Sequence, residues 1–158
     1  MKLHRPFIAV AALAVCLTWC VSCRTTAPLP PADLSAPGWQ LHQGQALWKP
    51  TKNRPELAGD LLLATNASGD YFIQFTKIPF TLASAQVMNG AWQIQFGDGH
   101  HSWRGKGAPP KRFAWFKLPA ALAGTTPAAP WTFTRRADDS WRLENSRTGE
   151  VLEGVFFP

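Results

Sequence analysis

The middle of the chain constrains the fold most, because its residues predict consecutive antiparallel strands. Two runs rich in apolar and aromatic residues, 61–65 and 71–75, flank the turn-forming residues 66–70. Asn89 and Gly90 follow, and both tolerate the positive φ angles of a type I′ turn, which makes this pair the strongest short signal for a hairpin. We therefore expect a meander of β-hairpins in this part of the chain.

The distribution of apolar side chains differs between these strands. Trp92, Ile94 and Phe96 alternate with glutamines, so they share one face of a strand whose other face is expected to lie in water. The first hairpin, by contrast, is apolar on both faces, which an antiparallel sheet shows only where something covers each side. A helix, a second sheet or a ligand must then cover the second face.

Composition is consistent with one turn-rich β domain. The 158 residues, 46% of them hydrophobic, suffice for one ordinary domain with a sizeable core. The 12 glycines and 14 prolines favour a β protein over a helical bundle. Removal of Lys2 and Arg5 with an export signal lowers the formal charge from +6 to +4, which favours anionic partners weakly. Nucleic acid is not an expected partner, because an exported protein does not meet it.

The N-terminus has the features of an export signal over residues 1–22. Basic residues precede an apolar run, 7–17, that is short for a membrane-spanning helix of roughly 20 residues. An uncleaved anchor helix is the alternative interpretation. All three cysteines lie at or before Cys23, so an exported domain has no disulfide available.

Val21, Ser22 and Cys23 resemble the lipobox of bacterial lipoproteins, in which a small residue precedes a cysteine that is lipidated and becomes the new N-terminus. Cys20 stands where that motif usually has leucine. The resemblance implies that Cys23 carries a lipid anchor in the cell envelope. Because Arg24 replaces the aspartate that retains some lipoproteins in the inner membrane, we expect the outer membrane, facing the periplasm.

Residues 23–38 are expected to form a lipidated, proline-rich tether, and residues 39–158 a single β domain. A free proline-rich tether of this length would reach about 45 Å from the bilayer. Residues 112–123 are the one later segment that could form a helix, in which Pro119 occupies the first turn or causes a kink and Gly124 follows the end. A second meander is predicted over residues 131–156.

Two meanders separated by a short apolar helical segment resemble the layout of the lipoprotein-localisation proteins LolA and LolB over residues 41–156. The closest local similarity comprises 59–63, 72–75 and Pro79-Phe80. The resemblance implies a mainly β fold, in which a curved antiparallel sheet forms an unclosed half-barrel and one short helical segment packs on its concave face. LolB-type proteins also carry an apolar side chain on a protruding loop between early strands, and the corresponding loop, 66–70, has none.

The same resemblance implies a non-catalytic carrier that binds an acyl chain or another apolar ligand in the concave face. The candidate cavity residues are Leu62, Phe72, Ala83, Ala85, Phe113, Phe116 and Leu122. Aromatic residues at the spacing of Phe113 and Phe116 also occur in ordinary cores. The alternative function is an envelope scaffold that binds a protein or, through Lys106, Lys111 and Arg112, an anionic glycan.

Motifs for catalysis, phosphate binding and metal binding are missing from the sequence, so we expect no enzyme, cofactor or metal. His100 and His101 are adjacent, and neighbours in a strand point to opposite faces. Asp98 and His100 can share a face, but two ligands make a weak site, and a solvated loop is favoured. The pair Asp138-Asp139 is typical of a turn.

Overall fold

The computed structural model describes residues 27–97, 99 and 101–158. Its elements are β1 (Trp39–Lys49), β2 (Leu57–Asn66), β3 (Tyr71–Lys77), β4 (Phe80–Met88), β5 (Ala91–Phe96), β6 (His101–Lys106), η1 (Ala114–Phe116), α2 (Leu118–Leu122), β7 (Trp131–Arg135), β8 (Trp141–Asn145) and β9 (Val151–Phe156). The expected export signal and the lipidated Cys23 lie outside the described residues. Neither helix within this part of the chain, three and five residues long, has the length or the apolar content to span a bilayer.

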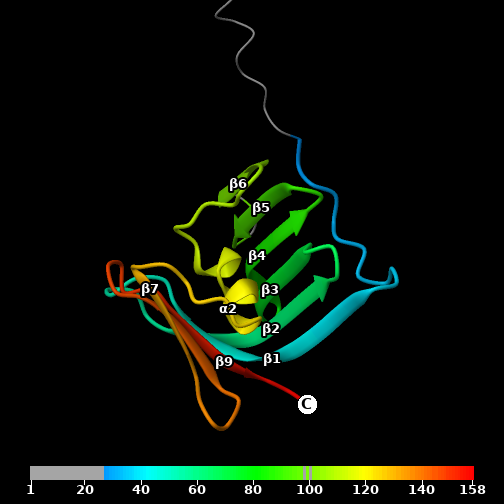
Figure 1. Ribbon diagram of the computed structural model, residues 1–158. Coiled ribbons are helices and arrows are strands. Elements are labelled where there is room, and N and C mark those ends of the chain that lie inside the picture. The colour runs from blue at the N-terminus through cyan, green and yellow to red at the C-terminus, as the bar shows by residue number, and fades with distance from the viewer. Residues whose placement is uncertain (1–26, 98, 100) are drawn as a thin grey trace, which may run out of the picture.

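The described strands form one antiparallel sheet, in which β1 lies between two groups of strands. Strand order is β6-β5-β4-β3-β2-β1-β9-β8-β7, so the last strand of the chain pairs with the first. We call β2–β6 the first arm and β7–β9 the second arm. The two arms bend towards each other, with η1 and α2 between them (Figure 1). The expectation of a mainly β, curved and unclosed sheet with a short helical segment on its concave face is confirmed.

Local turn chemistry fixes where the strands reverse. Asn89 and Gly90 both have positive φ angles, 51° and 71°, as the type I′ interpretation requires. Asp138 accepts hydrogen bonds from the backbone and hydroxyl of Ser140, and Asp139 has a φ of 60°, which confirms a turn there. Helix α2 has a proline in its first turn, and Gly124, with a φ of 92°, follows its end.

We call the side of the sheet that holds η1 and α2 the inner face. It carries the core, in which every strand from β1 to β5 and from β7 to β9 contributes at least one apolar side chain. Trp115 joins this core to the helical segment, with ring centroids 5.2 Å from Trp48 and 5.7 Å from Phe75. Strand β1 and the first arm therefore pack against Trp115, and the second arm belongs to the same core through Trp131, Trp141, Leu143 and Leu152.

The backbones of β1 and β9 lie unusually close together near the bend. A Cβ atom on Gly44 would collide with the carbonyl oxygen of Val155, and one on Gly154 with that of Gln45. Glycine is required at these positions because any larger residue would push β1 and β9 apart.

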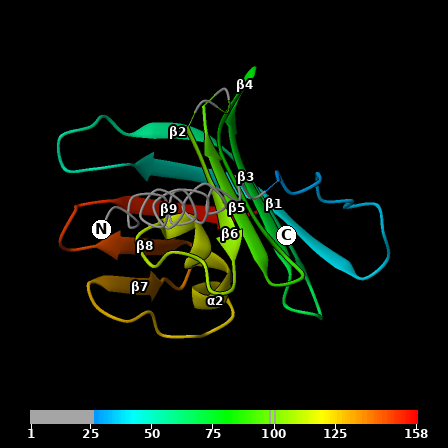
Figure 2. The same cartoon turned by 90° about the horizontal axis from the view of Figure 1, so that it is seen from above.

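The proline-rich segment contacts the outer face of the first arm. The Leu29 N–H donates a hydrogen bond to Gln93 Oε1 at 2.8 Å, and Gln86 Nε2 donates one to the Pro30 carbonyl at 3.1 Å. Figure 2 shows this segment on the side of strands β3–β5 opposite to α2. We call residues 28–31 the strap. These contacts correct two expectations. The proline-rich tether is docked on the sheet rather than free. The Gln93 side chain, which was expected to lie in water, is only 7% exposed.

Candidate ligand-binding site

The centre of the inner face is filled by side chains. Ala83 and Ala85 are 0% and 1% exposed, and both belong to the core that contains Trp115 and Phe116. Phe113 is half-buried beside Phe116, with ring centroids 6.1 Å apart. The small residues of β4 therefore make room for aromatic side chains of the chain itself.

Two candidate cavity residues lie on the other side of the sheet. Leu62 is flanked in register by Gln43 and Gln74, while its neighbours along β2 enter the core. Phe72 borders a pocket of about 240 Å³ beneath the strap. The placement of Leu62 and Phe72 in the concave face is therefore wrong. Because both faces of this hairpin are apolar, its alternation did not indicate which face turns inward.

Space for a ligand remains beside α2. Two pockets of about 280 and 220 Å³ open there, and both are bordered by Leu122 and Arg135. We call this pair the α2 site. The first pocket is lined by Gln40, His42, Leu63, Thr65, Pro119, Leu122, Ala123, Arg135 and Phe156. The second is lined by Ala121, Leu122, Gly124, Thr125, Thr126, Pro127, Phe133 and Arg135.

The α2 site combines an apolar lining with one permanent cation. Leu63, Phe133 and Phe156 supply apolar surface from three strands, and the exposed Arg135 stands where the two pockets meet. The residues that line the two pockets include no aspartate or glutamate. Such a site favours an elongated apolar ligand with an anionic end, because a guanidinium pairs well with carboxylate or phosphate.

Helix α2 contacts the core on one side and borders the two pockets on the other. Leu118 and Ala121 are its two buried side chains, whereas Leu122 is only half-buried between the pockets. No side-chain cap binds the N-terminus of α2. Leu118 belongs to the same core as Trp115, so a rotation of the half-buried Leu122 side chain, rather than a shift of the helix, would join the two pockets.

A larger cleft, about 500 Å³, lies on the outside where the second arm meets β1 and β2. Leu47 and Val155 are 38% and 37% exposed and provide its apolar surface. Asp60, Arg136 and Glu153 provide charges of both signs. We call this the outer cleft.

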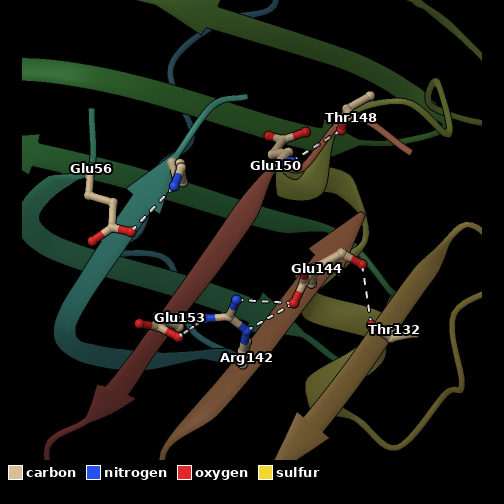
Figure 3. Close-up of polar contacts among 8 residues, drawn as sticks. Glu56, Thr132, Arg142, Glu144, Thr148, Glu150 and Glu153 are labelled. Atoms are coloured by element: carbon tan, nitrogen blue, oxygen red, sulfur yellow. Dashed lines mark hydrogen bonds and ion pairs between the residues drawn. The ribbon is translucent and has the colours of Figure 1, made fainter. Parts of the chain in front are cut away.

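The second arm carries an ion-pair network on its outer face (Figure 3). Arg142 donates hydrogen bonds to the carboxylates of both Glu144 and Glu153. The Arg142 side chain is 35% exposed, so these pairs contribute modestly to stability. Because Arg142 is hydrogen-bonded to the carboxylates of both Glu144 and Glu153, these two side chains do not form a free acid–base pair.

One carboxyl group is buried away from both ligand sites. Trp48 Nε1 donates a hydrogen bond to Glu150 Oε1 at 3.2 Å. Burial raises the pKa of Glu150 from 4.5 to about 7, against the smaller opposing effect of the Trp48 hydrogen bond. The group lies where β1, η1 and the start of β9 meet, so we assign it a role in stability.

An exposed apolar tip lies one hairpin later than the loop 66–70, for which no large apolar side chain was expected. Ile78 and Phe80 are 85% and 68% exposed at the turn between β3 and β4, whose end projects beside the β4 label in Figure 2. The loop 66–70 is polar, as its sequence indicates, and the Asn66 side chain accepts hydrogen bonds from the N–H groups of Ser68 and Asp70. Two large apolar residues around Pro79 were the signal that could have found the tip.

Of the histidines considered for a metal site, His101 begins β6, while residues 98 and 100 lie outside the described part of the chain. Within the described part, no three potential metal ligands gather. Comparison of the sequence with models of known protein families finds no match, and no curated protein has a matching sequence. Functional inference therefore rests on the residues and their geometry.

Proposed function

We propose that this protein is an envelope lipoprotein, anchored through Cys23, whose β domain carries an acyl chain or a similar apolar ligand without catalysing a reaction. The observation that carries the proposal is the α2 site, whose two pockets adjoin at Leu122 and Arg135. Ligand pockets commonly enclose about 300–1,000 Å³. Each pocket alone is slightly below that range, and displacement of Leu122 would join them.

The exposed tip at Ile78 and Phe80 supports the same function. Exposed apolar side chains on a projecting hairpin favour contact with lipid or with another apolar surface, which a carrier must approach to load or release its cargo. The layout resembling LolA and LolB adds to this proposal.

Displacement of a fluorescent fatty acid from the fragment 24–158 tests the carrier function. We expect saturable binding that Leu122→Trp weakens at least tenfold, because the indole fills the space between the two pockets. The matched control is Leu41→Trp, which places the same ring on the exposed outer face of β1 and should leave binding unchanged. Absence of saturable binding would overturn the proposal.

The lipid anchor is tested separately. Cys23→Ala should abolish incorporation of a labelled fatty acid and leave the unprocessed precursor, since the lipidated thiol is then missing. Continued labelling of this variant would mean that the anchor lies elsewhere.

The outer cleft favours a second candidate function, an interaction lipoprotein that binds a protein partner. Its apolar surface around Leu47 and Val155 is bordered by charges of both signs, as protein interfaces often are. Cross-linking in the native envelope distinguishes this role, because Leu47→Glu should abolish a specific adduct whereas Leu41→Glu should not. The same adduct from both variants would exclude the outer cleft as the interface.

A further inference from the structure

The strap fixes how far the anchor can stand from the sheet. Its backbone is bound at two successive residues, Leu29 and Pro30, by the amide side chains of Gln93 and Gln86. These two glutamines are cross-strand neighbours on β5 and β4, and both are less than 8% exposed. Buried amides that bind backbone groups in this way hold a segment in one register, because a shifted segment would keep them buried without these partners.

Only residues 24–27 separate Cys23 from the strap. Fully extended, the chain from Cys23 to Pro28 spans at most about 17 Å. The headgroup layer of a bilayer occupies about 6 Å of that reach, which leaves roughly 10 Å between the membrane surface and the strap. The free tether expected from the sequence would instead have allowed about 45 Å.

The outer face beside the strap is positively charged. Arg104 lies directly opposite Gln93 in the pairing of β5 with β6, and Lys106 lies opposite Ala91, so both side chains leave the sheet on the strap side. Cations within a few ångströms of a bilayer are attracted to anionic lipid headgroups, and salt screens that attraction.

We propose that the outer face of β4–β6 is a membrane-docking surface, which the strap holds against anionic lipid headgroups while the inner face opens away from the bilayer. This inference rests on the lipid anchor of the proposed function. It assigns the strap a positioning role and turns the α2 site towards the aqueous side, where a ligand can be received or passed on.

Fluorescence quenching by the bilayer tests this orientation on the full-length, acylated protein. Ser102→Cys places a thiol on the outer face of β6, and Thr132→Cys places a matched thiol on the outer face of β7, at the opposite edge of the sheet. Each thiol is labelled with a bimane fluorophore, and the protein is reconstituted in phosphatidylethanolamine–phosphatidylglycerol vesicles that contain nitroxide-headgroup lipid. We expect quenching several-fold stronger at position 102 than at position 132.

Two insertions distinguish the effect of the bound strap from the effect of tether length alone. A Gly/Ser spacer of about 15 residues, with a root-mean-square length of about 20 Å, is inserted either before Ala27 or between Pro37 and Gly38. The first insertion lengthens the path from the anchor to the strap and should abolish the difference between positions 102 and 132. The second lies beyond the strap and should preserve it.

The outcomes distinguish failure of the anchor from failure of the orientation. Absence of acyl label on Cys23 overturns both the proposed anchor and this inference. Acylated protein with equal quenching at the two positions, or with the same response to both insertions, overturns only the docking surface.

Discussion

The two arms of the sheet share one core but differ in what covers their outer faces. In the first arm, Gln86 and Gln93 are buried beneath the strap and bind its backbone. In the second arm, Arg142, Glu144 and Glu153 pair with one another at the surface. The same β alternation has therefore produced a covered outer face in one arm and a solvated, ion-paired one in the other.

This difference shows that polarity alone does not determine exposure. A neutral amide can be buried when a backbone group satisfies it, because its desolvation cost is moderate. A charged group stays near water, since its desolvation cost is far larger. The first arm is thus built to receive a chain segment, and the second arm to remain exposed.

The largest expected effect tests whether the arms are one cooperative unit. Trp92→Ala removes an inner-face indole from the first arm, and Trp141→Ala removes one from the second. Each substitution should lower the free energy of unfolding by about 3–5 kcal/mol. The effect of Trp92→Ala should be at the lower end, because Trp92 is half-buried whereas Trp141 is 2% exposed. Urea unfolding followed by circular dichroism should shift as one transition in both variants. Trp103→Ala, at a residue 39% exposed, is the control with a smaller effect. A second transition in either variant would show that the arms unfold separately.

A smaller, pH-dependent effect on stability is expected from Glu150, which lies where the second arm meets β1. Because the folded pKa of Glu150, about 7, exceeds the unfolded value of 4.5, stability from its protonated form is fully present below pH 4.5 and is lost as pH rises through 7. Glu150→Gln keeps an acceptor for Trp48 and removes this loss. Its stability relative to wild type should rise by about 2–3 kcal/mol between pH 5 and pH 8.

Denaturation midpoints of Glu150→Gln and wild type at these two pH values provide the measurement. Glu56→Gln, at an exposed residue paired with Lys49 at 3.8 Å, is the control and should show little pH-dependent difference. If the denaturation midpoints of Glu150→Gln and wild type differed by the same amount at both pH values, the raised pKa of Glu150 would be contradicted.

Variants of the strap and of the ion-pair network should lose similar, small amounts of stability. They should differ clearly in how well residues 27–38 are protected from proteolysis. Gln86→Ala and Gln93→Ala should each cost about 1 kcal/mol and expose residues 27–38 to limited proteolysis, because the strap is released. Arg142→Ala should cost less than about 1 kcal/mol and leave that segment protected, since its ion pairs are partly exposed. Equal cleavage rates in the three variants would mean that the glutamines do not hold the strap.

Local features of the fold were predictable from the sequence. The turns at Asn89-Gly90 and Asp138-Asp139 and the shared face of Trp92, Ile94 and Phe96 were expected and are confirmed. Turn chemistry and alternation act over a few residues, so their patterns can be recognised directly.

Long-range features were not predictable in this way. The strap binds mainly through its backbone, which leaves no signature in its side chains. Because both faces of the first hairpin are apolar, its sequence did not indicate that Leu62 and Phe72 face outward. No residue near Glu150 in the sequence indicated that its side chain is buried. The candidate site was anticipated only at Leu122, because the pockets beside it depend on how α2 meets β1, β7 and β9.

Pairing of β1 with β9 also sets an order of assembly. During synthesis, β2 to β6 can pair with preceding neighbours as soon as each hairpin is complete, because their partners are adjacent in sequence. The second arm can form its own hairpins, but it joins the sheet only when Val151–Phe156 has been made and reaches the free edge of β1. Until then β1 offers an unpaired edge, so the nascent chain is most vulnerable to wrong pairing in the interval before its last strand is available.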